Sequence, residues 1–123
     1  MASPSYREQE IQAATAALAK GHSDPKNLRE LLVWSTSKTT AEMIESYFRT
    51  HHRDSKLLSA LFAIAAEGED AGDAPWAAAN TIAEFPADML EPHRAELTEL
   101  SQHQWTYLSK PAKDALAKIQ NAA

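Results

Sequence analysis

Residues that start or stop helices recur along this chain at intervals of roughly 15 to 18 positions, and apolar residues fall at helical spacing between them. Capping aspartates or prolines stand at Asp24, Pro25, Asp54, Asp73 and Pro86. No stretch alternates apolar and polar residues in the way that a half-buried strand would. The pattern predicts one all-α domain over residues 1–123, with about seven helices in stacked antiparallel hairpins. A compact orthogonal bundle would produce a similar pattern.

Most of the predicted helices also carry their own start or stop signal. Gly21 ends the first one, and Thr39 with Glu42 three residues later has the form of a capping box. The last helix is predicted to begin at Ser109, with Pro111 in its first turn. The apolar positions that define the seven helices are Ile11, Ala14 and Leu18; Leu28, Leu31 and Leu32; Ala41, Ile44, Phe48 and His51; Leu57, Leu58, Leu61, Phe62, Ile64 and Ala65; Trp76, Ala79, Ile82, Ala83 and Phe85; His93, Leu97 and Leu100; and Ala112, Ala115, Leu116 and Ile119.

The charge of the chain is concentrated in residues 67–100, which contain nine acids and one base, Arg94. The whole chain has a formal net charge of −5, so this third of the sequence accounts for all of the excess. A single-sign surface attracts a cationic partner and speeds encounter, an effect that salt weakens. The alternative is an acidic helix surface that only increases solubility.

The same stretch predicts a helix hairpin. Asp73 is placed as N-cap before Pro75, the helix should continue to Phe85, and Pro86 should end it. A second helix is then expected from Asp88 or Glu91 onward. This proline-started, alanine-rich helix, its Phe-Pro corner and the Leu-spaced helix after it resemble HEAT-like helical repeats. The resemblance implies stacked helix pairs, although the Asp and Arg ladder typical of these repeats is not evident here.

The sequence contains no recognisable catalytic, metal or cofactor motif. With no cysteine there is no thiol nucleophile, and the five histidines lack the i, i+4 spacing that chelation on one helix face requires. No nucleophile elbow or Gly-rich phosphate loop is present. We therefore expect no enzyme, no cofactor and no metal. The enzyme alternative would need a polar pocket around His51, His52 or His93.

Composition also limits the partners and the compartment. Lys and Arg are not clustered, so nucleic-acid binding is not expected. The N-terminus has no apolar run of signal-peptide length, and the longest apolar run, around Leu57 to Ala66, is half as long as a membrane span requires. The absence of cysteine fits a reducing cytoplasm. We expect a cytoplasmic protein that does not bind membranes.

These observations favour a protein-binding inhibitor. Its size, compartment and charge are similar in type to those of bacterial immunity proteins, which neutralise a toxin or nuclease domain that is often basic. The expected partner-binding residues are the acids that flank the predicted hairpin, with Trp76 as the central anchor because tryptophan is frequent at binding hot spots. They are Glu67, Glu69, Asp70, Asp73, Trp76, Asp88 and Glu91. The alternative is a structural or adaptor helical-repeat module that holds a peptide or a partner protein in an apolar groove.

Overall fold

The computed structural model describes residues 5–68 and 71–122 and is all-α, with no strand in these ranges. The described residues form seven helices of eight residues or more, a four-residue helix and a 3-10 turn. Their bounds are α1 Tyr6–Lys20, α2 Pro25–Trp34, α3 Ala41–Arg49, α4 Ser55–Ala65, α5 Ala74–Ala83, α6 Ala87–Leu90, η2 Glu91–His93, α7 Arg94–Ser101 and α8 Thr106–Ala122. The predicted fold class, all-α with about seven helices, is confirmed.

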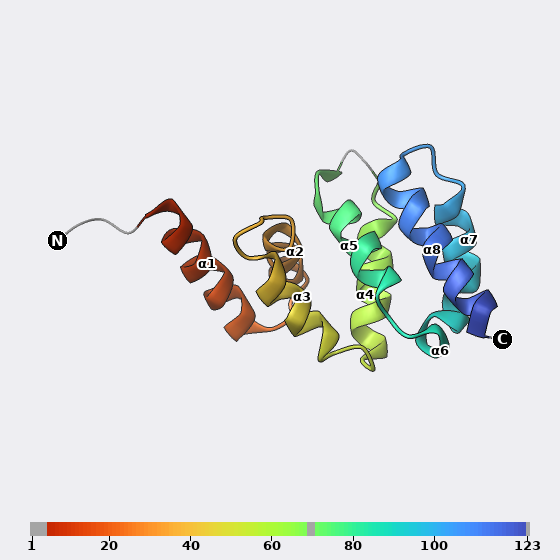
Figure 1. The fold of residues 1–123 in the computed structure, drawn as a ribbon, viewed down its shortest axis with the longest axis horizontal. Coiled ribbons are helices and arrows are strands. Elements are labelled where there is room, and N and C mark those ends of the chain that lie inside the picture. The colour runs from red at the N-terminus through yellow and green to blue at the C-terminus, as the bar shows by residue number, and fades with distance from the viewer. Residues whose placement is uncertain (1–4, 69–70, 123) are drawn as a thin grey trace.

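The helices form layers along the long axis of an elongated molecule (Figure 1). After α1, which lies at one end, the layers are α2 with α3, α4 with α5, and α7 with α8. Helix α5 lies in the middle of this arrangement and packs against α2, α4 and α8. Its alanines Ala77, Ala78 and Ala79 are buried, and their small side chains let these neighbours approach closely. The core is thus continuous from layer to layer.

Two of the predicted N-caps are confirmed. The Asp24 carboxylate accepts a hydrogen bond of 3.0 Å from the backbone N–H of Lys26 at the start of α2. The Asp54 carboxylate accepts bonds of 3.0 Å from the N–H groups of Lys56 and Leu57 at the start of α4. Both aspartates have extended backbone angles, which direct the side chain back over the first helical turn.

The start of α3 differs from the predicted capping box. The N-cap residue is Thr40, which makes no side-chain cap bond. Its hydroxyl is fully buried and donates to the carbonyl of Trp34 at 2.6 Å, so it joins α2 to α3 instead. Helix α3 ends at Arg49, and His51 lies beyond it.

In the C-terminal half, one predicted cap bond is absent and two helix boundaries were predicted incorrectly. Asp73 is the N-cap residue of α5, as predicted, but its backbone is already near-helical and its side chain makes no cap bond. Helix α5 ends at Ala83, and the next helix is divided into α6, η2 and α7. Helix α8 begins at Thr106, which places Pro111 in the helix interior. The earlier start brings Leu108 into the core, where it is fully buried.

No helix within residues 5–68 and 71–122 combines the length and the apolar character needed to cross a membrane.

Candidate functional site

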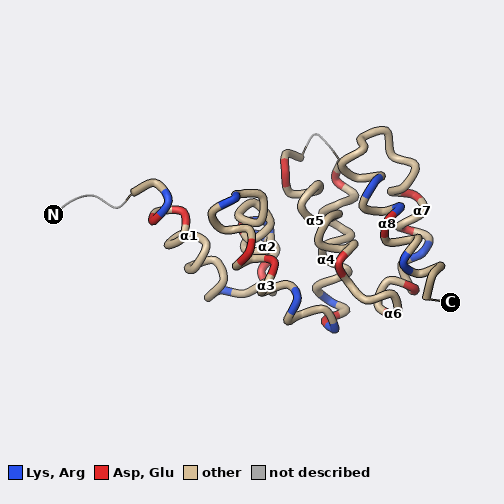
Figure 2. The backbone as a smooth tube through the Cα atoms, in the orientation of Figure 1, with Lys and Arg blue, Asp and Glu red and all other residues tan. Residues whose placement is uncertain are grey.

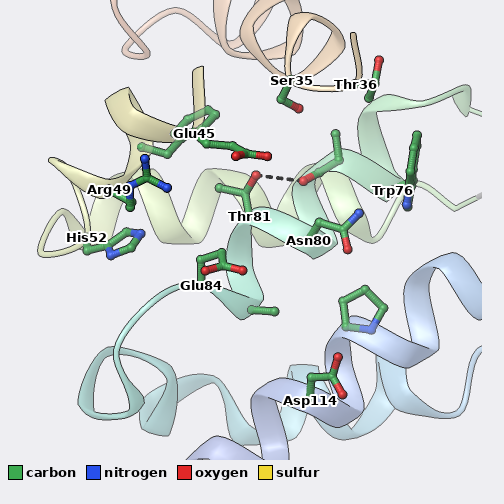
Figure 3. Close-up of a pocket in the computed structure, with 14 residues that line it drawn as sticks. Ser35, Thr36, Glu45, Arg49, His52, Trp76, Asn80, Thr81, Glu84 and Asp114 are labelled. Atoms are coloured by element: carbon green, nitrogen blue, oxygen red, sulfur yellow. Dashed lines mark hydrogen bonds between the residues drawn. The ribbon is translucent and has the colours of Figure 1, made fainter. Parts of the chain in front are cut away.

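An open groove of about 550 Å³ crosses three layers of helices. Helix α5 forms its floor, α3 with the α2–α3 corner forms one wall, and α8 forms the other (Figure 3). The helices that line it are consecutive in the stack, so the groove exists only when the layers are assembled.

Charged side chains enter the groove from all three helices. Glu45 and Arg49 come from α3, Glu84 from the end of α5 and Asp114 from α8, which gives three carboxylates against one guanidinium. Asp114 is paired with Lys110 at 3.2 Å. Glu45 and Glu84 have no ion-pair partner in the described part of the chain, although a groove wall carries Arg49. The groove is therefore acidic, with two carboxylates available to a ligand.

His52 lines the same groove, in surroundings that favour its neutral form. Its Nε2 is buried and has no hydrogen-bond partner among the described residues, and its ring packs 4.9 Å from that of Phe85. Burial lowers the pKa of His52, and Lys118 and Arg49 lower it further, while Glu84 opposes them. A neutral imidazole adds no positive charge of its own beside Glu45 and Glu84.

An aromatic cluster lies at one end of the groove. Trp76 lines the groove from the first turns of α5, and its ring centroid is 5.3 Å from that of Tyr107. Tyr107 is 55% exposed and contacts Trp105 edge-on at 5.5 Å. We refer to Trp76, Trp105 and Tyr107 as the aromatic shelf. The aromatic shelf offers aromatic surface to solvent beside the acidic floor of the groove. Large aromatic side chains are more often buried.

The predicted partner-binding residues do not lie together. Trp76 lies in the groove. Glu67 and Asp73 lie at the corner between α4 and α5, whereas Asp88 and Glu91 lie at the other end of α5, about 15 Å away along a helix of this length. Figure 2 shows acidic positions at both corners. Glu69 and Asp70 lie outside the described residues.

Three of the predicted acids are also paired with arginines of the same chain. Glu67 forms an ion pair with Arg29, and Asp88 forms one with Arg53. Glu91 pairs with Arg94 at 2.8 Å. The structure thus divides the predicted acidic face between two corners and partly compensates its charge. The partner-binding role of these residues stays a prediction.

Three other histidines make contacts within the chain. His22 lies between Tyr47 and Asp54, and His51 Nδ1 is 2.8 Å from the Tyr47 carbonyl. His93 stacks on Phe62 with ring centroids 4.4 Å apart. Over the described ranges, no three His, Cys, Asp or Glu side chains come together in a way that would hold a metal ion.

Sequence reasoning identified Trp76 as a binding residue and named His52 only for the enzyme alternative, but it missed the groove carboxylates and Asn80. Glu45, Asn80, Glu84 and Asp114 are each exposed on their own helix and read as ordinary solvent-facing residues. One signal was available: Trp76, Asn80 and Glu84 are spaced four residues apart, which places them along one side of a helix.

Comparison with protein-family models finds no match, and no curated protein or solved structure matches the chain.

Proposed function

We propose that this protein binds another protein, and that the groove over α5 receives a Lys- or Arg-bearing part of the partner. One observation carries the proposal: Glu45 and Glu84 line one groove without an ion-pair partner in the described chain, while Glu67, Asp88 and Glu91 are already paired. Unpaired carboxylates in a concave site gain most from an incoming cation. The two acidic corners add longer-range attraction that is sensitive to salt.

Within this function, we propose neutralisation of a basic toxin domain as the biological role. The small size, the net charge of −5 and the type of surface support a similarity to bacterial immunity proteins. Coexpression with the product of the adjacent reading frame tests this role. Protection of the cell against a basic toxic product would support it, and an adjacent product that is neither basic nor bound would count against it.

The second candidate is an adaptor module of the HEAT-like helical-repeat type. It is favoured by a groove that runs across successive helix layers, since such surfaces commonly hold extended partners. The adaptor and the inhibitor share the same binding surface. They differ in the effect of binding, because an inhibitor blocks the activity of its partner and an adaptor only holds the partner in place.

The binding proposal is tested with a fluorescent nine-residue peptide of mixed Lys and Arg, measured by anisotropy at low and moderate salt. The double variant Glu45→Gln/Glu84→Gln removes two charges from the groove. The matched control, Glu42→Gln/Glu99→Gln, removes two exposed charges that do not line the groove. Two exposed ion pairs together stabilise binding by roughly 1 kcal/mol, so we expect a loss of about three- to tenfold for the groove variant.

The control variant should change affinity by less than about twofold, because its charges act only at a distance. Equal losses for the two variants would show that the peptide senses net charge alone, and the groove would then not be the binding site.

A further inference from the structure

Three side chains on the floor of the groove follow one another along α5 at four-residue spacing. Trp76, Asn80 and Glu84 present an indole ring, a carboxamide and a carboxylate in that order, and all three line the groove (Figure 3). We refer to them as the α5 ladder. Successive steps of four residues on a helix are about 6 Å apart, close to the repeat of two residues in an extended chain, about 6.6 Å. The ladder therefore matches an extended peptide in its spacing.

Each step offers a different kind of contact. The exposed Asn80 amide makes no hydrogen bond within the described chain, and it carries both a donor and an acceptor. These two groups match the C=O and N–H of a peptide backbone. Glu84 is exposed and without an ion-pair partner in the same ranges, so it offers a carboxylate to a cation.

The indole of Trp76 is fixed in orientation by its neighbours. Tyr107 lies 5.3 Å from it, and Trp105 in turn holds Tyr107 edge-on. The Trp76 ring remains partly exposed within this support. A planar guanidinium stacks on such a ring and can pair with a carboxylate at the same time, whereas an ammonium is more strongly hydrated and does not stack.

We propose that the α5 ladder binds an extended, arginine-containing segment of the partner, with a guanidinium on Trp76, a backbone amide paired with Asn80 and a second cation at Glu84. This inference rests on the proposed function, because it assumes that the groove is the binding surface. It adds two properties that charge alone does not give: a preference for arginine over lysine and a contact to the backbone.

The test compares two nine-residue probes of equal charge, one of alternating serine and arginine and one of alternating serine and lysine. We expect the arginine peptide to bind about three- to fivefold more tightly, the size of an exposed cation–π contact. Trp76→Leu should remove this preference, while Tyr6→Leu, which changes an aromatic side chain that is 77% exposed on α1, should leave it intact. Asn80→Ala should weaken both peptides by the same factor.

A second measurement uses the unchanged protein, so that it does not depend on the folding of Trp76→Leu. The three tryptophans give three indole N–H signals in an NMR spectrum. The arginine peptide should shift the Trp76 signal. It should leave the signal of Trp34, whose Nε1 donates to Glu30 at 3.1 Å, in place.

The possible results separate the two proposals. If both peptides bind the groove with equal affinity, or if Asn80→Ala has no effect, the ladder is overturned while the proposed function stands. If neither peptide binds, both proposals fall. Tighter binding of the arginine peptide, lost in Trp76→Leu and accompanied by a shift of the Trp76 indole, is the result that supports the ladder.

Discussion

The imidazole of His22 lies 2.8 Å from the carboxylate of Asp54, although 32 positions separate them in the chain. The other ring nitrogen of His22 is 2.6 Å from the hydroxyl of Tyr47 on α3. Hydrogen bonding to Leu57 N–H lowers the pKa of Asp54, with further contributions from His22 and Lys56 that outweigh the effect of burial. One aspartate thus caps α4 and also joins it to the α1–α2 corner.

The double role of Asp54 predicts a larger mutational cost than capping alone. Asp54→Ala should destabilise the protein by about 2 kcal/mol, of which about 1 belongs to the cap and the rest to the partly buried bond with His22. Asp24→Ala is the matched control, because Asp24 caps α2 and has no histidine partner. It should cost about 1 kcal/mol in urea unfolding. Equal costs for the two variants would mean that the His22 contact contributes nothing.

His52 predicts a pH dependence near neutrality. Its pKa in the folded protein is lowered from 6.5 because burial disfavours the charged ring, so the unfolded chain takes up a proton first as the pH falls. The contribution of neutral His52 to stability is complete above about pH 6.5 and is lost between that value and its folded pKa. His52→Phe should therefore reduce the fall in unfolding free energy between pH 7.5 and pH 5. An unchanged slope would contradict the lowered pKa.

Thr40 and Thr39 provide a matched pair at the α2–α3 corner. Thr40→Val removes the buried hydroxyl that donates to Trp34 and leaves that carbonyl without this bond, at a cost of about 1 to 2 kcal/mol. Thr39→Val should change stability by less than about 0.5 kcal/mol, because Thr39 is partly exposed and makes no side-chain bond in the described chain. Thermal unfolding of the two variants measures the difference. A larger loss of stability for Thr39→Val than for Thr40→Val would support the predicted capping box instead.

Helix α1 should open more readily than the rest of the protein. It buries only Ala14 and Ala17, and it is held by Asn27, whose amide donates to the Ala17 carbonyl at 2.8 Å and to the Gly21 carbonyl. Asn27→Ala should increase amide hydrogen exchange throughout α1 while α5 stays protected. Gln12→Ala, at an exposed position of the same helix, should leave the exchange of α1 unchanged. Uniform acceleration in all helices would show that α1 is not a separate unit.

The sequence predicted a helix start correctly where neighbouring residues alone determine it. Asp24 and Asp54 are confirmed as caps, whereas Asp73 makes no cap bond although, like Asp24, it precedes a proline-containing first turn. The difference lies in the backbone before the helix, which is extended at the first two and near-helical at Asp73. Side-chain type does not reveal that backbone angle.

The groove was harder to predict because no single segment contains it. Glu45 and Glu84 are 39 positions apart and line one space only because α3 and α5 belong to neighbouring layers. The count of charges identified the acidic stretch but not the ion pairs that partly neutralise it, because Arg29 and Arg53 come from outside that stretch. The pairing of charges depends on tertiary structure. For this reason the acids that the sequence singles out are not the carboxylates that line the groove.

The order in which the helices contact one another also bears on how the chain reaches this structure. Most helices contact partners that are close to them in sequence, so little loop entropy opposes the early steps of assembly. Small helical domains rich in such local contacts fold in about microseconds to milliseconds, and we expect the same of this chain. A newly made copy would thus form its groove almost as soon as α8 has left the ribosome.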